Sequence, residues 1–190
     1  SAAAPRAKSR FFSPATAGSV RAIPRSCSTA AWAASSSSPG RASARRAIEL
    51  SPDLAEAQNA IALVSCVYEW DWPATDRAFR RALELNPGYI PARCWYAWFY
   101  QLMVRGEVDQ AITTARVAEE LDPLAAYPKS LLAAILAIGG QYDSALALTG
   151  EAIAREPGAF LAFFVQQFTC QFRGDYEQSI AVAEHALAIS

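Results

Sequence analysis

The sequence predicts an all-α protein made of repeated helical hairpins, and two observations lead to that prediction. Four prolines close similar phrases at spacings of 35, 36 and 34 residues: Pro52 in AIELSP, Pro87 in ALELNP, Pro123 in VAEELDP and Pro157 in AIAREP. Between the prolines, apolar residues recur with the period of an α-helix and are interrupted once by a break. Because one such hairpin buries its apolar face only against its neighbours, we predict a stacked solenoid.

The first forty residues lack this pattern. Residues 1–40 are mostly Ala, Ser, Arg and Pro, and we expect them to be disordered because they cannot bury enough apolar surface to offset the entropy lost on ordering. Three explanations stay open for this segment: an organellar transit peptide, a linker, or a GC-rich reading frame translated out of register. The repeat pattern begins abruptly at 41–52, which resembles the second helix of a hairpin without its first helix.

The clearest hairpin is predicted over 126–157. Four apolar residues between Leu131 and Leu136 share one helical face, two glycines at 139–140 break the helix, and a second helix ends before Pro157. Proline ends it because proline cannot continue a helix and also restricts the residue before it. The other predicted hairpins are 55–87, broken at EWDWP (69–73), 90–123, broken at Gly106, and 160–190, broken at Gly174.

The charge is divided unevenly along the chain. Residues 1–46 carry seven Arg and one Lys with no acidic residue, whereas 47–190 carry nine basic and eighteen acidic residues. The acidic body therefore has no broad basic face of the kind that phosphate backbones require, and we do not expect it to bind nucleic acid. No apolar run approaches the ~20 residues that span a bilayer, so we expect no membrane segment and a cytoplasmic location.

No residue pattern predicts catalysis or a cofactor. Cys27, Cys66, Cys94 and Cys170 are too scattered for a CxxC metal site, and we expect Cys66, Cys94 and Cys170 to be small core residues in a reducing compartment. His185, the single histidine, has no second ligand near it in the sequence, so no metal site is predicted. The chain has neither a glycine-rich phosphate loop nor a Gly-x-Ser-x-Gly turn. We therefore expect no enzymatic activity, no catalytic residue and no cofactor.

The repeats resemble the tetratricopeptide repeat over 41–190, and the resemblance implies a right-handed superhelical solenoid of antiparallel helix hairpins. Small residues recur where the two helices of a hairpin approach closely, because larger side chains would overpack there. Thr75 replaces one of these alanines, one extra residue stands at the break of 55–87, and two precede Gly106. In 126–159 the matching residues are Leu132, Ala133, Leu136, Gly140, Tyr142, Ala145, Ala152 and Pro157.

The resemblance also implies a concave groove lined by the first helix of each hairpin. Its lining would be largely apolar and aromatic, which suits a hydrophobic helix or an extended peptide, with Trp98, Phe164 and Phe168 as anchors. The alternative is that these aromatic residues form interhelical core. The predicted peptide-binding residues are Asn59, Leu63, Cys66, Cys94, Trp98, Gln101, Leu102, Leu161, Phe164, Phe168 and Gln171, and further groove positions are Glu56, Ser130, Ala134 and Ala137.

Some members of the family hold a peptide carboxylate with Lys, Arg and Asn in this groove. Here Lys129 is the single lysine of the repeats, and Asn59 alone among the groove positions has a suitable side chain. The resemblance therefore implies no carboxylate clamp in this chain.

We predict a protein-interaction scaffold that binds a protein or peptide partner in an apolar concave groove. Two alternatives stay open. The first is a repeat fragment of a larger bacterial transcriptional regulator or signalling enzyme, because 68–89 also resembles repeats found in such regulators. The second is an organellar import or assembly factor. We also expect the last helix to expose an apolar stripe.

Overall fold

The structure is a computed structural model that describes residue 46, residue 49 and residues 53–189. The disorder expected for 1–40 lies outside the described residues, as does almost all of the half-hairpin expected at 41–52. Cys27 also lies outside them. Among the residues that are described, no helix is long and apolar enough to cross a membrane.

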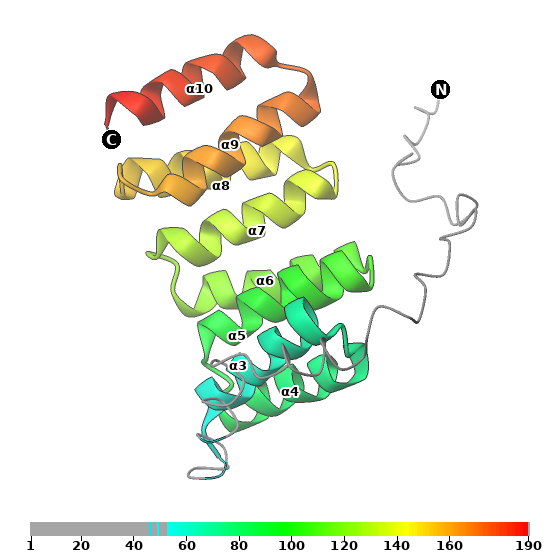
Figure 1. The fold of residues 1–190 in the computed structure, drawn as a ribbon. Helices are drawn as coiled ribbons and strands as arrows, with labels where there is room; N and C mark the ends of the chain where they lie inside the picture. The colour runs from blue at the N-terminus through cyan, green and yellow to red at the C-terminus, as the bar shows by residue number, and fades with distance from the viewer. Residues whose placement is uncertain (1–45, 47–48, 50–52, 190) are drawn as a thin grey trace, which may run out of the picture. The chain divides into compact units, whose positions relative to one another are not determined.

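From Ala55 to Ala188 every helix belongs to one of four hairpins, which follow one another in chain order from α3 to α10 (Figure 1). The predicted all-α architecture of paired helices is confirmed. Each hairpin packs on the next, since α7 contacts α6, α8 and α9. The helices are α3 (Ala55–Val64), continued by the π-helix η2 (Ser65–Glu69), α4 (Trp72–Leu85), α5 (Ile90–Trp95), continued by the π-helix η3 (Tyr96–Val104), α6 (Val108–Leu121), α7 (Ala126–Ile138), α8 (Tyr142–Arg155), α9 (Phe160–Arg173) and α10 (Tyr176–Ala188).

The recurring prolines stand where the sequence predicts helix ends. Helices α4, α6 and α8 each end two residues before a proline, namely Pro87, Pro123 and Pro157. An acidic or amide side chain closes two of these turns: the Asn86 Oδ1 accepts a hydrogen bond from the Gly88 N–H at 3.1 Å. Asp122 does the same for the two backbone N–H groups that follow Pro123, at 3.3 and 3.2 Å. The turn therefore fixes the direction of each new hairpin.

The break inside each hairpin needs one residue in the left-handed backbone region. Three hairpins place a glycine there, with φ of 68° at Gly106, 79° at Gly140 and 86° at Gly174. The first hairpin places Trp70 there instead, with φ of 55°. Its indole Nε1 donates to the Val67 carbonyl at 3.1 Å, and its ring stacks on Trp72 with centroids 6.4 Å apart. These contacts hold a bulky residue in a conformation that normally favours glycine.

The two π-helices occur in the two hairpins that carry extra residues before the break. Seven residues separate the small residue Ala133 from Gly140, but nine separate Ala97 from Gly106. In the first hairpin, eight separate Ala62 from the break at Trp70. A π-helix bonds i to i+5 and so holds more residues per turn than an α-helix does. The wider turns absorb the extra residues and leave the helix length matched to its partner.

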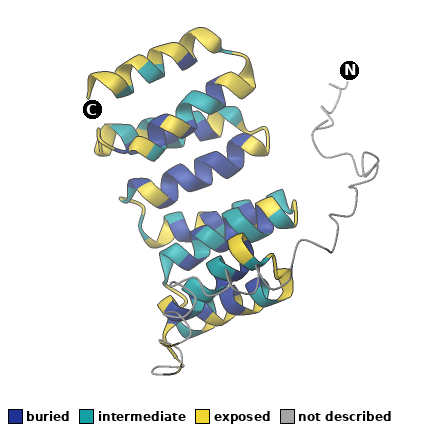
Figure 2. Cartoon of the chain, viewed as in Figure 1, coloured by how far each residue is buried: buried dark blue, intermediate teal, exposed yellow. Residues whose placement is uncertain are grey.

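Helix α7 is the centre of the largest core. All of its residues except Tyr127 and Ile138 are buried (Figure 2). Leu132, Ile135 and Leu136 of α7 share one apolar cluster with α6, α8 and α9. Alanines without exposed surface meet this core from both sides, which confirms the predicted role of small residues in close helix contact. They include Ala97, Ala111, Ala115 and Ala145.

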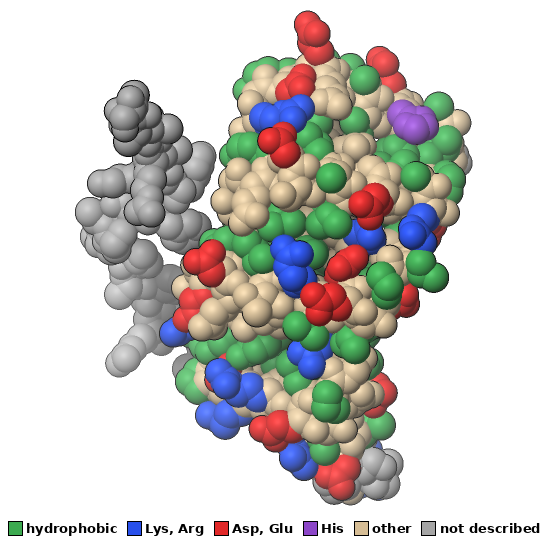
Figure 3. Space-filling model, turned by 180° about the vertical axis from the view of Figure 1, so that it is seen from behind, with side chains coloured by type: hydrophobic (Ala, Val, Ile, Leu, Met, Phe, Trp, Pro, Cys, Tyr) green, Lys and Arg blue, Asp and Glu red, His purple; other side chains and the backbone are tan. Residues whose placement is uncertain are grey.

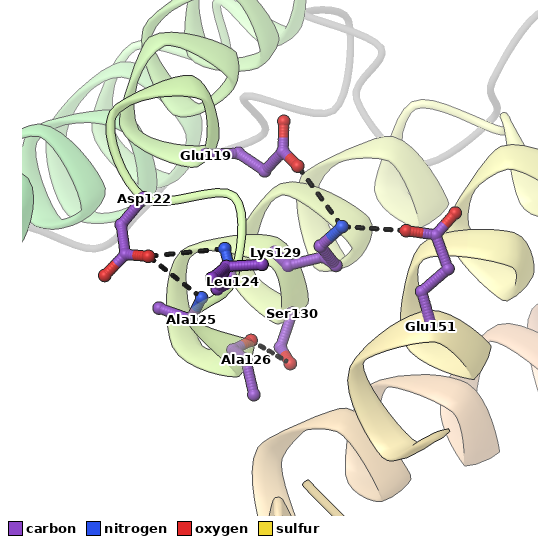
Figure 4. A network of polar contacts seen from close by, with 8 residues as sticks. All are labelled: Glu119, Asp122, Leu124, Ala125, Ala126, Lys129, Ser130 and Glu151. Carbon is purple, nitrogen blue, oxygen red and sulfur yellow. Dashed lines mark hydrogen bonds and ion pairs between the residues drawn. The ribbon is translucent and has the colours of Figure 1, made fainter. Parts of the chain in front are cut away.

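Lys129 ties three helices together within this core (Figure 4). Its side chain is only 6% exposed, and its Nζ lies 2.7 Å from Glu151 Oε2 of α8 and 3.3 Å from Glu119 Oε1 of α6. The hydrogen bond to Glu151 raises the pKa of Lys129, and burial opposes that rise. The same hydrogen bond lowers the pKa of Glu151. A buried ammonium paired on both sides fits a structural role, and it leaves no free lysine within residues 53–189 for a peptide carboxylate.

We expect Lys129→Ala to lower the free energy of unfolding by about 2–3 kcal/mol, because it removes the buried stem together with the cation that pairs with Glu119. Lys129→Met keeps the apolar stem and should lower it by less than about 1.5 kcal/mol. Urea unfolding of both variants measures the difference. An equal decrease in the free energy of unfolding for the two variants would show that the stabilisation comes from the charge of Lys129 and not from its buried stem.

The same pair predicts a defined pH window. Because folding raises the pKa of Lys129, its contribution is complete below the ordinary lysine pKa of about 10.4 and is lost as the pH rises through the folded value. Because folding lowers the pKa of Glu151, that contribution is present above about pH 4.3 and is lost as the pH falls through the folded value. The stability gap between wild type and Lys129→Ala should therefore narrow at both extremes, as urea midpoints across the pH range would show.

The left-handed backbone at Trp70 gives a second prediction. Trp70→Gly and Trp70→Ala lose the same indole contacts, but glycine adopts the left-handed region without the alanine penalty. We expect the glycine variant to be more stable by about 1 kcal/mol, the usual penalty for a side chain in this region. Thermal unfolding compares them directly, and an alanine variant as stable as the glycine variant would contradict the backbone assignment at this turn.

Candidate peptide-binding surface

The groove positions on α7 are covered by neighbouring helices. Ser130, Ala134 and Ala137 are all buried. Trp98 from η3 and Leu161 from α9 pack against the same core, and so does Phe168 of α9. The small residues on α7 let its neighbours approach closely.

The predicted groove residues of the first hairpin also lie inside the protein. Asn59 is buried, and its Oδ1 has no hydrogen-bond partner among the described residues. Leu63 is half-buried against the core that contains Phe79. Cys66 is buried, and its Sγ lies 3.9 Å from the Phe99 carbonyl oxygen. Glu56 alone among the predicted positions on this helix is exposed.

In the second hairpin, the predicted residues face other helices. Cys94 has no exposed surface, and burial raises the pKa of its thiol to about 12. Gln101 and Leu102 are buried as well, and Leu102 belongs to the core around α7. Gln101 lies at a hollow of about 340 Å³ whose other lining residues, Asp109, Gln110, Thr113 and Thr114, all belong to α6. The π-turn explains this placement, because it rotates the residues that follow Ala97 relative to an α-helix.

In the fourth hairpin, aromatic side chains of α9 reach the solvent. Phe164 is 52% exposed, while Phe168 is half-buried. The rings of Phe160 and Phe164 are 6.4 Å apart, those of Phe164 and Phe168 are 5.6 Å apart, and those of Phe168 and Phe172 are 5.3 Å apart. We call these four residues the phenylalanine ladder. Gln171, predicted for the groove, is exposed on the same helix.

Sequence reasoning missed two members of the ladder, Phe160 and Phe172, both of which are largely exposed. The signal was present, because four phenylalanines follow one another at i, i+4 steps in FLAFFVQQFTCQF. Groove positions taken from the repeat pattern select one narrow face of the helix. Residues at i, i+4 steps are displaced slightly around the helix at each step. Phe160 and Phe172, at the ends of the ladder, therefore lie outside the face that the groove positions occupy.

A second hollow, of about 200 Å³, adjoins one end of the ladder. It lies between the first turns of α7 and α9 and is partly walled by Phe160 and Leu161. Tyr127 stands on the α7 side, and its hydroxyl accepts a hydrogen bond from the Trp95 Nε1 at 2.7 Å. The remaining lining residues are Ala126, Ser130, Glu156, Gly158 and Ala159. Ladder and hollow together form a mainly apolar strip with one acidic side chain at its edge.

The face seen in Figure 3, which is the far side of the view in Figure 1, carries no basic field, because its Lys and Arg side chains are interspersed with Asp and Glu. Arg173, at the end of α9, is occupied by Asp143 and Asp175, at 3.3 and 2.8 Å. No group of three or more His, Cys, Asp or Glu side chains that could hold a metal ion occurs within the described part of the chain. His185 is exposed and meets the edge of Phe163, with ring centroids 5.3 Å apart.

Tyr96, the described tyrosine whose pKa is raised most, packs between two hairpins. The Tyr96 hydroxyl donates to Asp76 Oδ1 at 2.6 Å, and Arg80 Nε donates to the other carboxylate oxygen at 2.9 Å. Burial first, and then the hydrogen bond to Asp76, raise the pKa of Tyr96. The ring lies between Phe79 and Tyr100, at 5.4 and 5.6 Å. This network joins α4 to η3 and provides no open site for chemistry.

Comparison with known proteins identifies the fold. No protein-family model and no curated protein matches the chain. The crystal structure of YrrB, described as a TPR protein with an unusual peptide-binding site, shares 21% identity over 79% of this chain and 76% of its own, with a TM-score of 0.57. TTC0263, a thermophilic TPR protein of Thermus thermophilus, shares 18% sequence identity over 78% of this chain and 80% of its own, with a TM-score of 0.68. A chain of the Cut9–Hcn1 hetero-tetramer of the APC/C shares 18% over 83% of this chain and 30% of its own, with a TM-score of 0.67. At these identities the likeness concerns the fold, and it shows that residues 53–189 have the tetratricopeptide-repeat fold.

Proposed function

We propose that the chain is a protein-interaction scaffold that binds an apolar peptide or helix along the phenylalanine ladder of α9. The main support for this proposal is that aromatic rings are exposed in one continuous row, from Phe160 to Phe172. Single exposed apolar residues are ordinary on a protein surface, but a contiguous row of rings is a feature of binding sites.

The length of the phenylalanine ladder suits a short peptide segment. Twelve residues separate its ends, which corresponds to about 18 Å along a helix. That length matches about three turns of a bound helix or about five residues of an extended peptide. The hollow beside Phe160 would accept one further side chain at the end of that segment.

The fold supports the same proposal, because tetratricopeptide-repeat proteins commonly act as interaction scaffolds and YrrB is described as having a peptide-binding site. The buried residues Asn59, Cys66, Cys94 and Leu102 would then support the shape of the protein from within. Phe164, Gln171 and the exposed ladder ends would contact the ligand. Trp98 and Phe168 are held in the core on one side and would contribute one edge each.

Two ladder substitutions separate binding from folding. Phe164→Ser should weaken binding at least tenfold, because an exposed ring buried on binding contributes about 2 kcal/mol. It should change the free energy of unfolding by less than about 0.5 kcal/mol, as exposed positions usually do. Phe168→Ala should weaken binding and also lower that free energy by about 2 kcal/mol, because one side of its ring packs in the core.

The ligands for this test come from peptides selected by phage display on the immobilised chain and measured by fluorescence anisotropy. Met103→Ser is the matched control, because Met103 is an exposed apolar residue of η3 outside the ladder. Selected peptides that bind Phe164→Ser and wild type equally, or that lose affinity only with Met103→Ser, would rule out the ladder as the binding surface.

A further inference from the structure

The turn of the first hairpin exposes two stacked tryptophan rings. Trp70 is 65% exposed and Trp72 is 36% exposed. Their rings are nearly parallel, with an angle of 16° between the planes and centroids 6.4 Å apart. We call these two residues the tryptophan pair. Since Trp72 covers one side of Trp70 and most of the Trp70 side chain is exposed, the other face of that ring is open to solvent.

The backbone at Trp70 indicates that its side chain has a use beyond closing the turn. Among the described residues other than glycine, Trp70 alone has a positive φ, and the other three hairpins use glycine at this place. A bulky side chain costs free energy in the left-handed region, and such residues persist mainly where the side chain serves a function. Trp70 belongs to none of the core clusters of the described residues, so packing does not explain its presence.

The indole of Trp70 is held in a fixed orientation. Its Nε1 donates to the Val67 carbonyl at 3.1 Å, at the end of the same helical segment. Stacking on Trp72, the first residue of α4, restrains the ring from the other side of the turn. A ring that is already oriented loses little conformational freedom when a ligand stacks on it.

The chain around the tryptophan pair is acidic. Residues 53–76 contain five Asp or Glu residues and neither Lys nor Arg. Asp71 lies between the two tryptophans and is exposed, and its Oδ1 accepts the Ala74 N–H at 3.0 Å as the N-cap of α4. Within the described residues, no ion pair involves Asp71. Its negative charge is therefore available to a cation from outside.

An open indole face beside a carboxylate matches the side chain of arginine. The face of an indole attracts a cation, and the flat, weakly hydrated guanidinium group stacks on aromatic rings. Adjacent Cα atoms are about 3.8 Å apart, so the charge of Asp71 acts on that cation within the screening length of about 10 Å. The same carboxylates repel an anionic membrane surface, and they add nothing to the binding of a neutral proline-rich segment.

We propose that the tryptophan pair binds an arginine side chain of a second protein. The guanidinium stacks on the open face of Trp70, and the charge of Asp71 holds it there. This site is separate from the proposed peptide-binding function, because it lies in the first hairpin and recognises a cation, whereas the ladder lies in the fourth hairpin and is apolar.

The probe is a labelled peptide, Gly-Ser-Arg-Gly-Arg-Ser-Gly, and its matched control carries citrulline, which is neutral and has almost the same shape, in place of both arginines. Fluorescence anisotropy against the full chain measures both Kd values. We expect the arginine peptide to bind at least fivefold more tightly than the citrulline peptide. On ¹⁵N-labelled protein, the arginine peptide should also shift the indole Nε1–H signal of Trp70, which Trp70→Gly identifies by removing it.

Trp70→Gly is the sharpest variant, because glycine removes the ring and adopts the left-handed backbone without strain. It should remove the preference for arginine over citrulline. Trp70→Asn is a second variant without the ring, since asparagine also tolerates this region. Phe172→Ser removes an exposed ring of the ladder instead and should leave the Kd of the arginine peptide unchanged.

Asp71→Asn tests the charge separately from the fold. Asparagine caps a helix about as well as aspartate does, so the start of α4 is kept. We expect this variant to bind the arginine peptide about threefold more weakly, and its Kd should depend less on NaCl between about 50 and 500 mM. The Kd of the citrulline peptide should not change. Far-UV circular dichroism checks that each variant is folded.

Several results would overturn the proposal. No binding of the arginine peptide up to about 1 mM, or equal affinity for both peptides, would rule out recognition of a cation. Equal affinity of wild type and Trp70→Gly for the arginine peptide would place binding elsewhere on the acidic body. A Trp70 indole signal that moves with salt without peptide would mean that an arginine of the same chain occupies the ring. Binding to phosphatidylcholine vesicles that Trp70→Gly abolishes would make a lipid surface the ligand.

Discussion

Close contact between small residues on successive helices is the constraint on which the rest of this structure depends. Ala97, Ala111, Ala115 and Ala145 have no exposed surface, and they let the apolar side of α7 reach its neighbours on both sides. A single larger side chain at one of these positions would separate two helices and loosen the core around α7. Each hairpin buries its apolar face against the next hairpin, so the contacts between hairpins depend on this close helix spacing.

The same constraint explains why Ser130, Ala134 and Ala137 of α7, which were expected to line the groove, are buried. Ala134 and Ala137 share one core cluster with residues of α9 and η3. Within the described residues, exposed apolar surface remains on the ladder of α9 and on Tyr176, Ile180 and Leu187 of α10.

Much of the fold could be predicted from the sequence, because prolines, glycines and small residues each impose a local geometry. Pro87, Pro123 and Pro157 follow the ends of three helices, and Gly140 has the positive φ that its place at the break requires. The π-turns could not be predicted, although the extra residue before Trp70 was visible in the sequence. An insertion can lengthen a loop or widen a helix, and only packing against the partner helix decides between them.

The candidate site was harder to predict, for the same physical reason. Repeat positions alone placed Gln101 and Cys94 in a groove, but the π-turn brings Gln101 beside α6, and Cys94 lies in the core. Phe164 is exposed as its position implied, whereas Phe160 and Phe172 needed the i, i+4 pattern of α9 itself. Side-chain exposure depends on the neighbours in space, which a repeat register describes only on average.

Native-state hydrogen exchange would test this account most directly, because amide protection reports how well each helix is covered. We predict that the amides of Leu132 to Ala137 in α7 exchange most slowly, near the rate set by global unfolding. Those of α10 should exchange much faster, through local opening of a helix whose outer face is bare. Equal protection of α7 and α10 in the isolated chain would contradict the account, because it would mean that Tyr176, Ile180 and Leu187 of α10 are already covered.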